Sequence, residues 1–195
     1  MVRPRPEVLF GEEQIRKRIQ ELGVEITKAF AGREITVLGL MKSCLLFMAD
    51  LVRSVPLDMS CHFLRATSLR DEGHGPVRTD IVYSAEVPYH GRDILLLADI
   101  VDTGITLNFL LEHIREQGPG SLRVAAIIDK PGERKIDANP DWALFTLNEP
   151  LDRFLVGYGL DFQESYRGLP YIGTIPRAAP APEGRTLAIT PKGQG

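Results

Sequence analysis

The stretch ILLLADIVDTGITLNFLLEHI, residues 94–114, decides the fold because its residue pattern changes twice. Four consecutive apolar residues, Ile94 to Leu97, indicate a β-strand that is buried on both faces. The apolar residues at the end of the stretch recur at three- and four-residue steps, as on one face of an amphipathic helix. These residues are Leu107, Leu110, Leu111 and Ile114. A buried strand followed by a short turn and a helix is typical of a βαβ unit.

The turn between this strand and this helix is polar and rich in groups that bind anions. It contains Asp99, Asp102, Thr103, Gly104 and Thr106. Free N–H groups and the positive end of the helix dipole favour a phosphate at a helix N-terminus. The two threonines add hydroxyl donors, and the glycine lets a ligand approach the backbone closely. Because carboxylates repel phosphate, the two aspartates indicate a ligand that also offers hydroxyl groups, a metal ion or an acidic proton.

Other segments alternate between predicted helices and strands. Helices are expected at about residues 12–30 and 45–55, and strands at 35–40, 59–63, 81–83, 122–128 and 142–147. Residues 67–80 contain two glycines, a proline and many polar side chains, and we expect a loop there. The alternation predicts an α/β fold with a mostly parallel, twisted sheet that is flanked by helices.

Four charged side chains that could bind a ligand or transfer a proton follow predicted strands. These are Lys42, Asp99, Asp102 and Lys130. Ligands of parallel sheets bind at the carboxyl ends of the strands. We therefore expect these four side chains to surround one crevice.

The composition is that of an ordinary globular protein. Of the 195 residues, 44% are hydrophobic and 25% charged, and the net charge of −3 gives no support for binding nucleic acid. No apolar run reaches the roughly 20 residues of a membrane span, and no signal-peptide core precedes the first helix. We therefore expect a cytoplasmic protein with neither nucleic-acid nor membrane partners, and a flexible Pro/Ala/Gly-rich tail at 176–195.

The cysteines and histidines give no metal-binding pattern. Cys44 and Cys61 are too few for a disulfide framework or a zinc site, and we expect two buried, reduced thiols. The four histidines show no ligand spacing. A bound metal would then be Mg²⁺, held largely through the phosphates of a ligand.

The string ADIVDTGITL, residues 98–107, resembles the phosphoribosyl-diphosphate signature of type I phosphoribosyltransferases, and more narrowly of the hypoxanthine/guanine enzymes. The similarity extends from about residue 37 to 175 and includes RFLVGYGLDFQESYRGLPYIG, residues 153–173. It implies a type I phosphoribosyltransferase fold with a small hood that is built from the chain ends. It also implies a purine-salvage enzyme that transfers 5-phosphoribosyl from phosphoribosyl diphosphate to hypoxanthine or guanine. The products would be IMP or GMP and pyrophosphate, and the cofactor Mg²⁺.

The resemblance further implies the domain organisation and the assembly. Residues 1–175 would form a single domain. Its core would be about 35–150, and its hood would combine the N-terminal part with about 151–175. The family is usually dimeric or tetrameric, which implies a homodimer or a homotetramer.

Individual residues also receive roles from this resemblance. Asp102 would be the general base or acid that faces N7 of the purine, and Asp99 would bind the ribose hydroxyls. The 5′-phosphate would bind to residues of the turn, namely Asp102, Thr103, Gly104, Ile105 and Thr106. The diphosphate would bind to Lys42, Ser43, Ser68 and Arg167. The purine would bind to Lys130, Phe154 and Leu155, and Mg²⁺ would bind to Asp161. An ammonium group at Lys130 can donate to a 6-oxo group but cannot accept from an amino group. Such a contact would select 6-oxopurines over adenine.

The chain departs from the family pattern at three places. Ala98 replaces an acidic residue, Leu69 replaces a tyrosine of the loop over the diphosphate, and Ser43 replaces a glycine. The Ser43 turn often has a cis peptide in the family, which would be Met41–Lys42 here. Loss of a charge-assisted hydrogen bond at Ala98 would cost about 1.5–3 kcal/mol of binding. Two alternatives therefore stay open: a weakly catalytic regulatory protein that binds nucleotide or phosphoribosyl diphosphate, and a phosphoribosyltransferase for another base.

Overall fold

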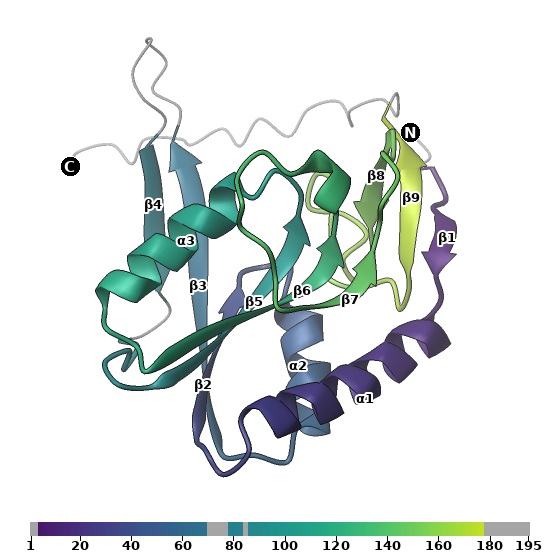
Figure 1. The fold of residues 1–195 in the computed structure, drawn as a ribbon. Coiled ribbons are helices and arrows are strands. Elements are labelled where there is room, and N and C mark those ends of the chain that lie inside the picture. Colours follow the sequence, from purple (N-terminus) through teal and green to yellow (C-terminus); the bar gives the residue numbers. More distant parts are fainter. Residues whose placement is uncertain (1–3, 70–77, 84–85, 178–195) are drawn as a thin grey trace, which may run out of the picture.

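A six-stranded sheet forms the centre of the structure, a computed structural model that describes residues 4–69, 78–83 and 86–177 (Figure 1). The strand order is β4-β3-β2-β5-β6-β7. The strands are β2 (Ile35–Leu40), β3 (Met59–Leu69), β4 (Arg78–Tyr83), β5 (Asp93–Val101), β6 (Ser121–Asp129) and β7 (Trp142–Thr146). Strand β4 pairs antiparallel with β3, and the other neighbours pair in parallel. The predicted α/β fold with a mostly parallel sheet is confirmed.

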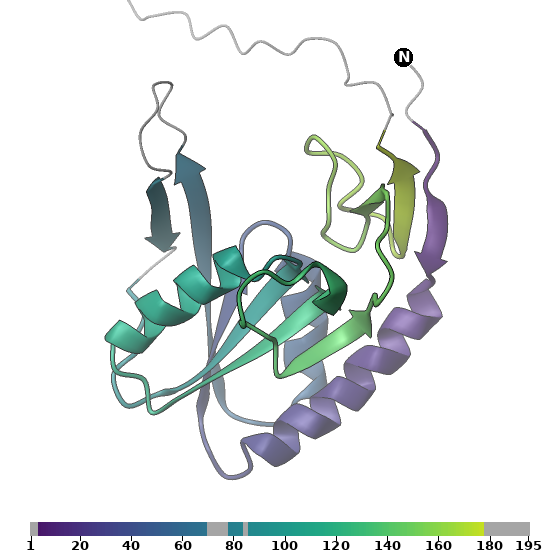
Figure 2. The ribbon, with the colours of Figure 1, turned by 45° about the horizontal axis from the view of Figure 1, so that its top comes forward.

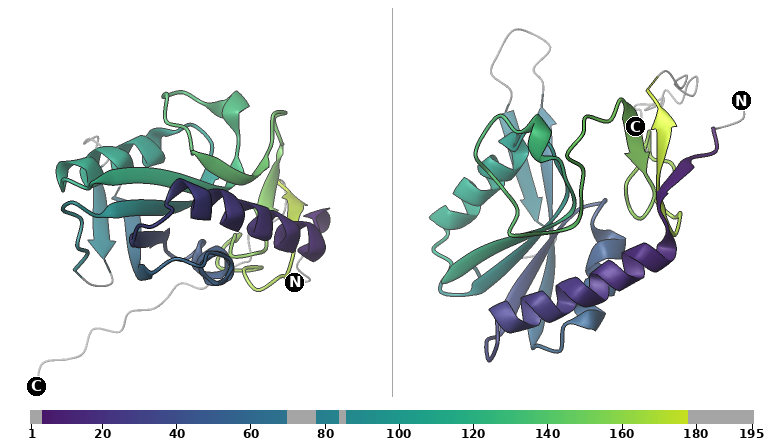
Figure 3. Two further views of the ribbon diagram at one scale, coloured as in Figure 1. Left: turned by 60° about the horizontal axis from the view of Figure 1, so that its bottom comes forward. Right: turned by 45° about the vertical axis from the view of Figure 1, so that its right-hand side comes forward.

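Helices cover both faces of this sheet. Helices α1 (Glu12–Ala29) and α2 (Leu45–Ser54) lie on one face, and α3 (Ile105–Glu116) lies on the other (Figures 1 and 3). On β5, Leu95 and Leu97 belong to the apolar cluster of α1 and α2, whereas Leu96 belongs to the cluster of α3. The strand is therefore buried on both faces, as its unbroken apolar run predicted. None of the described helices is both long enough and apolar enough to cross a membrane.

The second helix ends where its sequence predicts. Pro56 follows α2, and Val55 before it has extended torsions, with φ −114° and ψ 106°. A residue that precedes proline is driven away from the helical region by the proline ring. The chain consequently leaves α2 and turns into β3.

A second, three-stranded sheet forms the hood. Its strands β1 (Glu7–Phe10), β9 (Ile172–Pro176) and β8 (Arg153–Val156) pair antiparallel in this order. This sheet lies beyond the carboxyl ends of the parallel strands. In Figure 2 it is at the upper right, and the ends of β3 and β4 are at the upper left. Segments from both ends of the chain therefore build the hood, as the fold prediction stated.

Two expectations are corrected by the structure. Strand β3 continues to Leu69 and β4 begins at Arg78, so residues 67–69 and 78–80 of the expected loop are paired antiparallel strands. Its polar residues mislead because β4 is the edge strand and pairs antiparallel with β3, and such a pair needs no continuous apolar run. Cys44 is buried, but Cys61 is exposed, because its face of β3 is only partly covered. The tail expected at 176–195 lies outside the described residues from 178 onwards.

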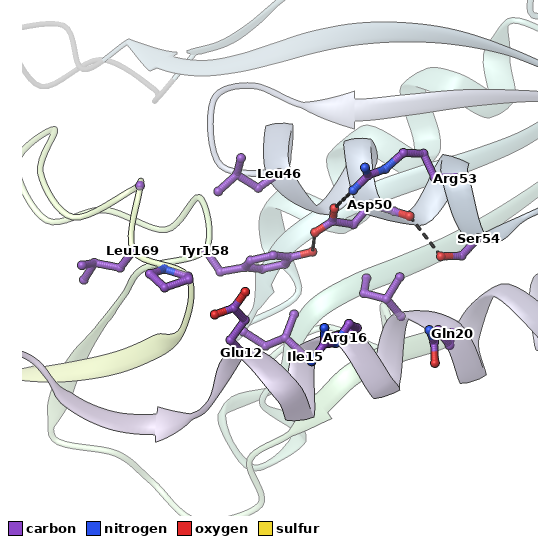
Figure 4. A pocket seen from close by; sticks show the side chains of 13 residues that line it. Glu12, Ile15, Arg16, Gln20, Leu46, Asp50, Arg53, Ser54, Tyr158 and Leu169 are labelled. Carbon is purple, nitrogen blue, oxygen red and sulfur yellow. Dashed lines mark hydrogen bonds and ion pairs between the residues drawn. The ribbon is translucent and has the colours of Figure 1, made fainter.

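Tyr158 connects the segment between β8 and β9 to helix α2. Its hydroxyl donates to Oδ2 of Asp50 on α2 at 2.8 Å, and Asp50 also pairs with Arg53 (Figure 4). The Tyr158 side chain belongs to the same apolar cluster as α1 and α2. Burial, followed by the hydrogen bond to Asp50, raises the pKa of Tyr158 far above its ordinary value. The hydroxyl therefore stays protonated over the ordinary pH range and acts as a donor.

We predict that Tyr158→Phe lowers the free energy of unfolding by about 1–2 kcal/mol at neutral pH, because one hydrogen bond to a carboxylate is lost. The folded state raises the pKa of Tyr158, so above pH 10, roughly, only the unfolded state releases this proton. The advantage of the wild type over the variant is thus complete below that pH and shrinks above it. Urea unfolding of both proteins on either side of this pH measures the change. If the two proteins differed in unfolding free energy by the same amount at both pH values, the hydrogen bond from the Tyr158 hydroxyl would not be the source of the difference.

Candidate active site

The turn after β5 directs its carbonyl groups toward a neighbouring segment. Arg134 donates from Nη1 to the carbonyl oxygen of Val101 at 2.9 Å and also to that of Asp102. The backbone N–H groups of the next two residues both donate to the carbonyl oxygen of Thr103, at 2.9 and 3.2 Å. The N–H groups in the first turn of any α-helix have no partners within the helix. With the carbonyl groups turned away, the N–H groups face the place where an anion would bind. In the free protein that of Thr103 donates to Oδ1 of Asp102 at 2.5 Å, and that of Ile105 to Oγ1 of Thr103 at 3.5 Å.

Gly104 is required at the point where this turn becomes α3. Its φ is +81°, in the left-handed region that favours glycine. A Cβ atom at this position would lie only 2.8 Å from the carbonyl oxygen of Ile136. From the sequence we expected glycine here because a ligand approaches the backbone. The structure shows that glycine is also needed because another segment of the chain comes close to it.

Arg134 is the residue that the sequence did not identify. Its side chain is only 11% exposed, and it forms an ion pair with Asp129 at the end of β6. Nε donates to Oδ1 of Asn139 at 3.1 Å. The buried guanidinium therefore connects the end of β6 with the turn after β5. Its position has no signal in the sequence because two of its acceptors are backbone carbonyl groups.

The two predicted carboxylates lie at the carboxyl end of β5. Asp99 is half-buried and accepts the N–H of Ile100 at 2.8 Å, whereas Asp102 is exposed in the turn. Ala98 is buried, and it belongs to the apolar cluster around α3. The backbone N–H of Lys130 donates to the carbonyl of Val101 at 2.9 Å, which joins the ends of β5 and β6.

The residues predicted to meet the purine come from two different parts of the chain. Lys130 is buried between β6 and a 3₁₀ turn, η1 (Pro131–Glu133), and its ammonium pairs with Glu133. On β8 of the hood, Leu155 is buried. Phe154 is half-buried, and its ring lies against Phe162 with centroids 4.7 Å apart at 32°.

The turn between β2 and α2 lies against the hood. The peptide between Met41 and Lys42 is cis, as the resemblance implied. A Cβ atom at Gly159 would lie 2.0 Å from the carbonyl oxygen of Ser43, so the hood and this turn are in direct contact. Nζ of Lys42 forms an ion pair with Oε2 of Glu164 at 2.9 Å. The structure thus brings Lys42 and Ser43 next to the segment that carries Asp161 and Arg167.

Within the hood, Arg167 and Asp161 form an ion pair. Nη2 of Arg167 lies 2.9 Å from Oδ1 of Asp161, and Nη1 donates to the carbonyl of Gly159 at 2.8 Å. The other oxygen of Asp161 accepts the backbone N–H of Glu164 at 2.7 Å. Nε of Arg167 is buried and has no acceptor among the described residues.

Ser68, which was predicted to bind the diphosphate, lies in β3 opposite Thr79 of β4. Its side chain and that of Leu69 lie outside what the structure describes.

The described residues contain no group of three or more His, Cys, Asp or Glu side chains that could hold a metal ion. Mg²⁺ does not need such a group when phosphate oxygens supply most of its ligands. One carboxylate, that of Asp161, pairs directly with Arg167, and Glu164 contacts both Arg167 and Lys42. The donor set therefore fits a Mg²⁺ ion that arrives with a phosphate ligand.

A cavity of about 560 Å³ lies between α1, α2 and residues 168–170 (Figure 4). Its lining includes Ile15, Ile19, Asp50 and Tyr158. None of the side chains predicted for the site lines it. It is therefore separate from the group at the carboxyl ends of β2, β5 and β6.

Comparisons with known proteins point to one family. The family model described as a phosphoribosyl transferase domain matches residues 10–163. The hypoxanthine-guanine phosphoribosyltransferase of Bacillus subtilis is 37% identical over 168 residues, which cover 86% of this chain and 92% of that protein. A crystal structure of a hypoxanthine-guanine phosphoribosyltransferase from Bacillus anthracis is similar with a TM-score of 0.77 and 33% identity, over 86% of this chain and 96% of the other. The hypoxanthine phosphoribosyltransferase of Trypanosoma cruzi matches with a TM-score of 0.75 and 27% identity, over 86% and 95%.

We predict that Arg134→Met lowers the free energy of unfolding by about 3–5 kcal/mol, because Asp129 and two carbonyl groups lose their buried donor. Arg123→Met is the matched control, since Arg123 also pairs with an aspartate but is 57% exposed. We expect the control to change stability by less than about 1 kcal/mol. Urea unfolding measures both variants, and equal losses would show that Arg134 has no special role in holding the turn.

Proposed function

The chain belongs to the phosphoribosyltransferase family, and we propose that it transfers 5-phosphoribosyl from phosphoribosyl diphosphate to hypoxanthine or guanine. The products are IMP or GMP and pyrophosphate, so the reaction salvages purine bases. The observation that carries the proposal is the turn after β5, with its carbonyl groups bound by residues 134–136 and two aspartates at its start. Such a turn suits a ligand that carries both a phosphate and hydroxyl groups.

The 5-phosphoribosyl group would bind at this turn. The N–H groups and hydroxyls of residues 102–106 would hold the 5′-phosphate, and the half-buried Asp99 would accept hydrogen bonds from the ribose hydroxyls. The exposed Asp102 would stand near N7 of the purine and take its proton as the glycosidic bond forms. The transition state has oxocarbenium character on the ribose, so the enzyme needs no nucleophile of its own.

The purine would bind between Lys130 and the hood. An ammonium group has three donors, and Glu133 accepts from Lys130 in the free protein. The remaining donors would bind the 6-oxo group of hypoxanthine or guanine. The ring of Phe154 would stack on the base, and the backbone of Leu155 would meet its edge. Because adenine has an amino group instead of the oxo group, Lys130 would select against it.

The leaving diphosphate would bind to Lys42, Ser43, Ser68 and Arg167. The support for this part is that Lys42 and Arg167 share Glu164 as a neighbour. Mg²⁺ bound to the diphosphate would neutralise part of the charge that develops on the leaving group. Asp161 would contact that ion, while Lys42 and Arg167 hold the diphosphate oxygens in place.

The proposal includes the assembly and the compartment. Because the family is usually dimeric or tetrameric, we propose that the chain forms a homodimer or a homotetramer. Its substrates are polar small molecules of the cell interior, and we propose that it acts in the cytoplasm.

The direct test is turnover of phosphoribosyl diphosphate and Mg²⁺ with hypoxanthine, guanine, xanthine and adenine. We expect nucleotide from 6-oxopurines and none from adenine. Asp102→Asn should lower kcat by about 10²–10⁴-fold and keep IMP binding, since it removes the proton acceptor but not the phosphate turn. Tight IMP binding without product from any base would instead support a regulatory nucleotide-binding protein. Product from a different base alone would support a phosphoribosyltransferase of another specificity.

A further inference from the structure

Glu164 lies where two cations of the proposed diphosphate site meet. Its Oε2 atom is 2.9 Å from Nζ of Lys42 and 3.5 Å from Nη2 of Arg167. One carboxylate oxygen thus faces an ammonium and a guanidinium group at once. A diphosphate would contact the same two cations through its own oxygen atoms, so the two anions cannot both occupy this position.

The cluster around Glu164 carries no excess of positive charge. Asp161 pairs with Arg167 at 2.9 Å, which gives two carboxylates for two cations. An added diphosphate would therefore meet two negative charges as well as two positive ones, and like charges at this distance repel. Binding becomes favourable when one carboxylate moves away and its place is taken by phosphate oxygens.

Glu164 is the carboxylate that can leave. Its side chain is 65% exposed, whereas that of Asp161 is 25% exposed and also accepts the backbone N–H of Glu164 at 2.7 Å. Lys42 is 52% exposed, and ion pairs between exposed side chains contribute little net stability. The contact can therefore break at small cost when a stronger ligand arrives.

Glu164 is also kept ionised and close to Lys42. The hydrogen bond from Lys42 is the main cause that lowers the pKa of the Glu164 carboxyl below its ordinary value. The backbone of Gln163 and Glu164 is left-handed, with φ of +52° and +59°, in the tight turn before Arg167.

We propose that Glu164 is an internal competitor of the diphosphate group. Its carboxylate binds Lys42 and Arg167 in the free enzyme, gives way when phosphoribosyl diphosphate binds, and returns when pyrophosphate leaves. The inference rests on the proposed function and adds a residue that sets the affinity for one part of the substrate. Because IMP has no diphosphate, it does not displace Glu164.

The test is Glu164→Gln, which keeps the size of the side chain and removes its charge. We expect the Kd of inorganic pyrophosphate and the KM of phosphoribosyl diphosphate to fall about two- to fivefold, as an exposed ion pair is removed. The Kd of IMP and the KM of hypoxanthine should stay the same. Glu34→Gln is the matched control, because it removes an ion pair with Arg92 that is 2.7 Å long and similarly exposed. This pair lies at the amino ends of β2 and β5, away from the proposed site. The control should change none of these constants.

Glu164→Asp separates contact from charge. Aspartate keeps the charge but is one methylene shorter, so it loses the contact with Lys42, and we expect tighter pyrophosphate binding here too. Provided that the wild type forms nucleotide, three results would overturn the inference. They are a wild-type affinity for pyrophosphate in Glu164→Asp, an unchanged or weaker affinity for pyrophosphate in Glu164→Gln, and an equal change in the Kd of IMP. A wild type that neither forms nucleotide nor binds pyrophosphate would overturn the proposed function, and the inference with it.

Discussion

The contact between residues 134–136 and the carbonyl groups of residues 101–103 is the constraint on which the site depends. Left unbound, these carbonyl oxygens would put negative partial charge beside any phosphate at the carboxyl end of β5. Arg134 and the two N–H groups that follow it bind them instead. Asp129 keeps the guanidinium in place, and Gly104 allows the segments to touch. The first turn of α3 can then present donors to an anion, with Asp102 beside them.

Three cations of the proposed site are bound to carboxylates of the chain itself. The pairs are Lys42 with Glu164, Lys130 with Glu133, and Arg167 with Asp161. In the proposed site, substrate binding would thus exchange one anion for another at Lys42 and Arg167. At the 5′-phosphate it would instead use the N–H groups of the turn, of which that of Thr103 donates to Asp102 in the free protein. In the proposed site, this difference would give the two ends of phosphoribosyl diphosphate different roles. The 5′-phosphate would anchor the substrate, and the diphosphate end would be released after the reaction.

The sequence predicted the elements that local patterns determine. The unbroken apolar run of β5 and the periodic apolar residues of α3 indicated a buried strand, a turn and a helix, and all three are present. The parts of β3 and β4 at residues 67–69 and 78–80 were taken for a loop, because an antiparallel pair with an edge strand can carry many polar residues. Arg134 and Glu164 were missed for different reasons. The first binds backbone carbonyl groups, which have no sequence signature, and the second meets Lys42 only because the hood folds over a distant turn.

The most direct test of the central claim follows the backbone amides by NMR during titration with IMP and, separately, with inosine. The two ligands share base and ribose, and they differ in the 5′-phosphate alone. Donation from the turn to that phosphate predicts large shifts at the amides of residues 103–106 with IMP, and small shifts there with inosine. Equal shifts with both ligands, or shifts confined to residues outside this turn, would contradict the account.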